Sequence, residues 1–202
     1  MRKSLKLIKF ILPTFVIAMI ILSPSCVNVG KFSSVKEFDC TNPLAKIEKI
    51  PGTPGIMIAP TNCQDYTYIK EKVAQALFIF VEEYSREFEV SQRYVWSMLA
   101  GLKIEVSVHG RKVDAAYDVN GKLITDADVN GLALSKKHIW VEINTKQINT
   151  SALIHELIHT MIWNEQKVHA DPDHEGSQYS GWTKSHTRLM KDINILLMDS
   201  GI

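Results

Sequence analysis

The sequence is poor in cysteine, in excess charge of either sign and in long apolar runs, and each shortage excludes a class of protein. Three cysteines in 202 residues are too few for a disulfide scaffold. The 23 basic residues nearly balance the 22 acidic ones, and the first 25 residues hold four of the basic and none of the acidic residues. Because the remainder is slightly acidic, a basic nucleic-acid-binding domain is not expected. The chain has no low-complexity tract or internal repeat, and a hydrophobic fraction of 46% at this length predicts one folded domain.

The N-terminal segment predicts export. Basic residues up to Lys9 precede a mostly apolar run from Phe10 to Leu22, which is too short to cross ~30 Å of hydrocarbon comfortably. This is the pattern of a signal peptide, which we place at residues 1–25. The following Leu22-Ser23-Pro24-Ser25-Cys26 resembles a bacterial lipoprotein box, which implies that Cys26 is lipidated and anchors the chain to a membrane of the cell envelope. Secretion without lipidation and an uncleaved N-terminal anchor are the alternatives.

The other two cysteines, Cys40 and Cys63, are expected to form a disulfide. An even pair outside the cytoplasm is more often a bridge than a metal site or a nucleophile. The loop between them contains Pro51-Gly52-Thr53-Pro54-Gly55. On the chain-entropy model the bridge would stabilise this irregular segment by roughly 3 kcal/mol. A catalytic cysteine is the weaker alternative.

The mature chain divides into a tether with a loop-rich lead-in, residues 26–64, and a domain of residues 65–202. In the domain, Asp65 can cap a long helix and Ser91 a short one that ends at Gly101. The apolar stripe of the long helix has helical spacing. Its members are Ile69, Val73, Leu77, Phe80, Tyr84 and Phe88.

The periodicity then changes from helix to strand. Residues 102–109 alternate between apolar and polar, Asn120-Gly121 offers a tight turn, and short strands are predicted at Gly131–Leu134 and Ile139–Ile143. A further helix follows, with Asn149 or Thr150 as its cap. Helices before and after a group of strands indicate an α+β fold in which helices back a small sheet.

The most informative motif is His155-Glu156-Leu157-Ile158-His159. One helical turn separates the two histidines, so their imidazoles converge on one ion, and Glu156 is placed to activate a metal-bound water. Imidazole nitrogen suits Zn²⁺, and a catalytic zinc takes three protein ligands and keeps a position for water. Residues around the histidines are apolar, which predicts a buried helix with one polar stripe.

This motif resembles the active-site helix of zincin metalloproteases, which short strands of a small sheet precede. The resemblance covers roughly residues 102–182 and implies a zincin-like α+β fold with a small mixed sheet, one Zn²⁺ per chain, and peptide-bond hydrolysis with Glu156 as general base. Peptide deformylases share the motif, but their Gly-rich segment and cysteine ligand are missing here. The chain also differs from metzincins, because Ile162 and Glu165 stand where these have a glycine and the third histidine.

The third ligand is expected in the cluster from His169 to Glu175. Its segment Asp171-Pro172-Asp173-His174 resembles the D-x-x-H segment of small bacterial zincins, which implies His174 as the zinc ligand. From the residues alone other ligands stay open. These are Asp171, Asp173, Glu175 and His169.

Other roles are assigned more loosely. Tyr179 and His186 are candidate transition-state stabilisers, and Trp163 and Trp182 are expected in the core or in a pocket wall. Residues 130–134 are a candidate edge strand for an extended peptide. These predictions describe a metallopeptidase of the cell envelope whose partners are a peptide or protein substrate and, through the lipid anchor, a membrane. The alternative is a non-catalytic zinc-binding lipoprotein with a structural or partner-binding role.

Overall fold

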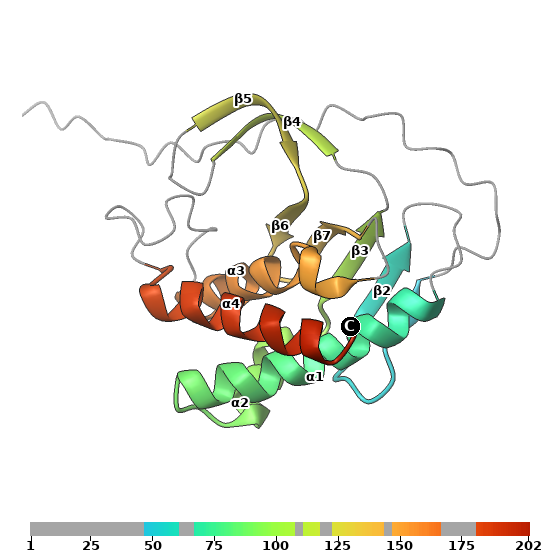
Figure 1. Ribbon diagram of the computed structural model, residues 1–202, viewed down its shortest axis with the longest axis vertical. Helices are drawn as coiled ribbons and strands as arrows, with labels where there is room; N and C mark the ends of the chain where they lie inside the picture. The colour runs from blue at the N-terminus through green and yellow to red at the C-terminus, as the bar shows by residue number, and fades with distance from the viewer. Residues whose placement is uncertain (1–46, 61–66, 108–110, 118–122, 144–146, 167–180) are drawn as a thin grey trace, which may run out of the picture.

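The computed structural model describes residues 47–60, 67–107, 111–117, 123–143, 147–166 and 181–202 (Figure 1). The expected signal peptide, Cys26, the Cys40–Cys63 pair and the Asn120-Gly121 turn lie outside these residues. None of the helices in the described ranges combines the length and apolarity that a membrane crossing requires.

Five strands form a mixed sheet in the order β1-β2-β3-β7-β6. Their bounds are Glu48–Lys49 (β1), Met57–Pro60 (β2), Lys103–Ser107 (β3), His138–Glu142 (β7) and Gly131–Ser135 (β6). The strands β2, β3 and β7 run parallel, whereas β1 and β6 pair antiparallel with their neighbours at the two edges. This arrangement confirms the α+β class and the small mixed sheet.

Part of the expected lead-in belongs to the folded domain. Both β1 and β2 lie before residue 64, and Ile50, Ile56 and Ile58 are fully buried. Gly52 and Gly55 take positive φ values of 75° and 77°, which makes a tight connection between the two strands. The domain therefore begins before residue 65, because strand pairing gives this segment an order that its Pro- and Gly-rich composition does not indicate.

The first two helices agree closely with the sequence pattern. Helix α1, Thr67–Glu87, buries the middle of its predicted stripe, and helix α2, Gln92–Leu99, begins after Ser91. The Ser91 hydroxyl accepts a hydrogen bond of 3.2 Å from the Tyr94 N–H, as a helix cap should. Gly101 follows with φ at 73°. Both predictions at the ends of α2 are thus confirmed.

Between β3 and β6 the chain makes a separate antiparallel hairpin. Its strands are β4, Arg111–Tyr117, and β5, Leu123–Val129. Figure 1 shows this hairpin above the end of β6, into which β5 leads directly. The alternation predicted for β3 is confirmed, because Ile104 and Val106 are buried between half-buried neighbours.

The last two helices are α3, Leu153–Gln166, and α4, Lys184–Asp199. Figure 1 shows α1, α3 and α4 on one side of the sheet, with α3 against β6 and β7 and α4 against α1 and α3. The predicted caps of α3 are wrong, because Asn149 and Thr150 lie in a preceding 3-10 turn, Ile148–Thr150. The hydroxyl of Ser151 instead accepts the Leu153 N–H at 3.2 Å.

Candidate metal site

Helix α3 is buried at the centre of the domain. Its apolar side chains at Leu153, Ile154, Leu157, Ile158, Met161 and Ile162 are fully buried. Glu156 and His159 are also buried, at 4% and 6% exposure, and His155 is half-buried. The prediction of a buried helix with one polar stripe is therefore confirmed. Such a stripe needs polar partners, because unpaired buried polar groups cost free energy.

The two histidines converge through the same ring nitrogen. The distance from Nε2 of His155 to Nε2 of His159 is 3.0 Å, and the ring planes meet at 70°. Two nitrogens bound at ~2.05 Å to one tetrahedral zinc lie about 3.3 Å apart. The observed separation is close to this value, so the pair fits a shared zinc ion as two of its ligands.

The indole of Trp182 packs against both histidines. Its ring centroid lies 4.9 Å from each imidazole centroid, and its Nε1 donates a hydrogen bond of 2.9 Å to the Thr187 hydroxyl. The side chain is 2% exposed. Trp182 therefore forms one wall of the histidine pair, as its sequence position suggested.

Glu156 lies against strand β6. Burial raises the pKa of its carboxyl to about 8, and a hydrogen bond from the backbone N–H of Ala133 lowers that pKa in part. A carboxyl with a pKa in this range can take up and release a proton near neutral pH. Gly131 and Ala133 of β6 approach Glu156, and the motif does not indicate either contact. The glycine at the start of this strand is the one signal of close approach that the sequence carries.

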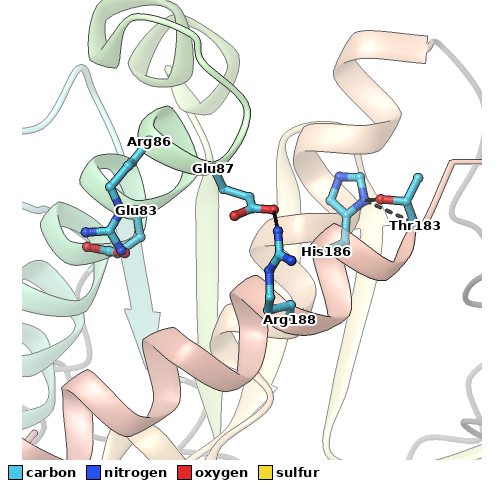
Figure 2. A network of polar contacts seen from close by, with 6 residues as sticks. All are labelled: Glu83, Arg86, Glu87, Thr183, His186 and Arg188. Carbon is cyan, nitrogen blue, oxygen red and sulfur yellow. Dashed lines mark hydrogen bonds and ion pairs between the residues drawn. The ribbon is translucent and has the colours of Figure 1, made fainter.

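The second candidate stabiliser, His186, is held in a helix cap. Its Nδ1 accepts a hydrogen bond of 3.0 Å from the backbone N–H of Thr183, as Figure 2 shows at the start of α4. The ring also packs on Phe88 at 4.6 Å and on Trp182 at 5.9 Å between centroids. Because Nδ1 accepts this bond, His186 fixes the start of α4 and supports Trp182, a role that the sequence analysis did not assign.

Charged contacts hold α4 on α1. Arg188 pairs with Glu87 across the two helices, while Arg86 pairs with Glu83 within α1 (Figure 2). The pKa of Glu87 is lowered mainly by a hydrogen bond from Ser185, with a further contribution from Arg188. The contacts of Arg188 and Ser185 with Glu87 join the start of α4 to the end of α1, and Trp182 stands just before α4 beside the histidine pair.

The C-terminal end of α3 is tied to other elements. The side-chain amide of Asn164 donates to the carbonyls of Met98, Lys136 and Thr160 at 3.2, 3.0 and 2.9 Å. Tyr84 donates to Oε1 of Glu165 at 3.2 Å. The carboxylate at position 165, where a metzincin has its third histidine, is thus engaged with α1.

The third ligand stays a prediction. Residues 167–180, which hold His174, its alternatives and Tyr179, lie outside the described residues. Within the part of the chain that the structure describes, no three metal-binding side chains form one group. A search against known protein families found no match, and neither the curated proteins nor the solved structures contain a detectable relative.

Proposed function

We propose that this chain is a zinc-dependent metallopeptidase of the zincin type, exported to the bacterial cell envelope and anchored through Cys26. The observation that supports this most is the convergence of His155 and His159, with Nε2 atoms 3.0 Å apart on a buried helix that also carries Glu156. The mixed sheet beside this helix agrees with the fold that the motif resemblance implies.

In this proposal His155, His159 and His174 hold the zinc ion. Bound zinc supplies a Lewis acid that polarises a peptide carbonyl and lowers the pKa of water. Glu156 accepts the proton of the attacking water and delivers it to the leaving amine nitrogen.

The edge strand β6 supplies a place for an extended substrate. The Asn130 carbonyl accepts the Glu142 N–H at 2.7 Å, so the backbone of Asn130 faces β7. Backbone groups alternate along an antiparallel strand, and those of Gly131 and Ala133 therefore face the other edge. The Ala133 N–H at this edge donates to Glu156, so a peptide that added to β6 would pair with the remaining backbone groups of the edge and pass beside Glu156.

The test is Glu156→Gln in the full chain, purified in detergent with zinc supplied. We expect the variant to keep its zinc and to lose at least about a hundredfold in turnover of a peptide library. Glu165→Gln is the matched control, because it makes the same change on the same helix and should keep its turnover. Equal turnover in the Glu156 variant and the wild type would contradict the proposal.

A second outcome would favour the non-catalytic alternative. A structural zinc is closed by four protein ligands, whereas a catalytic zinc keeps a position for water. Wild-type chain that binds zinc, shows no turnover and presents four protein ligands by X-ray absorption would be a zinc-binding lipoprotein without hydrolase activity.

A further inference from the structure

Gly131 lies where a side chain would collide with the candidate general base. A Cβ atom built at this position would lie 2.5 Å from Oε1 of Glu156, 2.9 Å from Cγ of Glu156 and 2.6 Å from Cβ of Ala152. All three distances are shorter than the contacts that real Cβ atoms make. The glycine is needed for space and not for backbone conformation, because the described glycines with positive φ are Gly52, Gly55, Gly101 and Gly201.

Strand β6, which carries Gly131, is paired with β7 along its other edge. Gly131 pairs with Val141 and Ala133 with Ile139 of β7. Both β7 residues are fully buried in the core. A methyl group at position 131 could therefore not be accommodated by a simple outward shift of β6, since the shift would disturb pairing with a buried strand.

The same strand donates the hydrogen bond that Glu156 accepts from Ala133. Gly131 and Ala133 are two residues apart, so they present the same edge and the same face of β6 to helix α3. One residue leaves room for the carboxyl group, and the other supplies the N–H that orients it. Strand β6 and helix α3 thus together fix the position of the Glu156 carboxyl group.

We propose that Gly131 is a positioning residue for Glu156, whose lack of a side chain lets the carboxyl group sit against β6. This inference rests on the proposed function, in which Glu156 moves the proton. Displacement of a catalytic group by about 1 Å can cost up to a hundredfold in rate. Gly131→Ala should therefore lower kcat by about tenfold or more, while KM and zinc content stay near the wild-type values.

The experiment measures kcat and KM on fluorescein-labelled casein, together with zinc content and thermal unfolding, for the full chain in detergent. A second variant, Gly131→Ala with Ala152→Gly, removes one of the two collisions and keeps the one with Glu156. We expect its unfolding midpoint to move back toward the wild type while kcat stays low. Recovery of kcat together with the midpoint would overturn the inference, because the effect would then arise from helix packing. So would a kcat for Gly131→Ala within about twofold of the wild type.

A stability cycle tests the contact independently of turnover. The Glu156→Ala variant lacks Oε1 and Cγ, the two Glu156 atoms that a Cβ at position 131 would meet. In this variant Gly131→Ala should therefore lower the unfolding midpoint less than it does in the wild type. Equal losses in the two backgrounds would overturn the inference. If the wild type cleaves nothing but the losses differ, the proposed function fails and the placement of Glu156 by Gly131 stands.

Discussion

The phenolic hydroxyl of Tyr84 donates a 3.2 Å hydrogen bond to Oε1 of Glu165 and so joins the last turn of helix α1 to the end of the candidate metal-binding helix α3. Burial raises the pKa of Glu165 above its usual 4.5, and hydrogen bonds from Tyr84 and Tyr94 lower it in part. Burial raises the pKa of the Tyr84 hydroxyl, and the contact with Glu165 raises it further. Position 165 therefore has a structural role in the described fold.

Replacement of Glu165 by Gln should change stability in a pH-dependent way. The pKa of this carboxyl is higher in the folded chain than in the unfolded chain, so its ionisation destabilises the folded state. The free energy of unfolding of the wild type therefore falls as pH rises from about 4.5 through the folded pKa. Glutamine keeps an acceptor for Tyr84 and carries no charge. We expect the Gln variant to gain on the wild type in thermal midpoint between pH 4 and pH 7, by scanning calorimetry at about unit steps. Glu82→Gln, at an exposed position of α1, is the control. If the thermal midpoint of Glu165→Gln moved closer to that of the wild type as pH rises, this prediction would be wrong.

The cap of α2 offers a direct test of local structure. Ser91→Ala removes the hydroxyl that accepts the Tyr94 N–H and should lower the free energy of unfolding by about 1 kcal/mol in urea titrations. Ser97→Ala makes the same change inside the helix, where the hydroxyl donates to the Tyr94 carbonyl. That control should change stability by less than about 0.5 kcal/mol. Equal effects at the two positions would refute the cap assignment.

Substitution of the predicted third ligand should weaken zinc binding. If His174 completes the site, His174→Ala leaves two protein ligands where a catalytic zinc has three, and zinc affinity should fall by at least about tenfold in competition with a chelator. His138→Ala, which removes a histidine on β7 beside Glu105, is the matched control and should bind zinc like the wild type. Unchanged affinity in the His174 variant would move the ligand to Asp171, Asp173, Glu175 or His169, each of which can be tested by the same measurement.

Trp182 should support the histidine pair by packing. In Trp182→Ala the wall against both imidazoles is lost, and we expect about 3–5 kcal/mol less stability together with weaker zinc binding. Trp182→Phe keeps an aromatic wall but removes the hydrogen bond to Thr187, so it should retain most of its zinc affinity. If the Phe variant lost as much zinc affinity as the Ala variant, the ring would not be the feature that matters.

Signals that lie within one helix were readable from the sequence. The spacing of the histidines, the Ser91 cap and the turn at Gly101 each depend on residues a few positions apart, and the structure has all three. Strands β1 and β2 were not predicted, because their order comes from pairing with distant residues. For the same reason the motif identified Glu156 but not its neighbours on β6, which only the sheet topology brings to it. The cap that His186 makes with Thr183 was not predicted for another reason, since a histidine stands where such a cap usually has glutamate or glutamine.

We propose that the histidine pair of α3 binds a catalytic zinc, and the zinc content of the full chain tests this. It is measured in detergent after zinc is supplied and the excess is removed. We expect about one zinc per chain in the wild type and in His138→Ala, whose histidine lies on β7 beside Glu105, and little zinc in His155→Ala and His159→Ala. Folded wild-type chain that takes up no zinc, or histidine variants that keep as much zinc as the wild type, would contradict it.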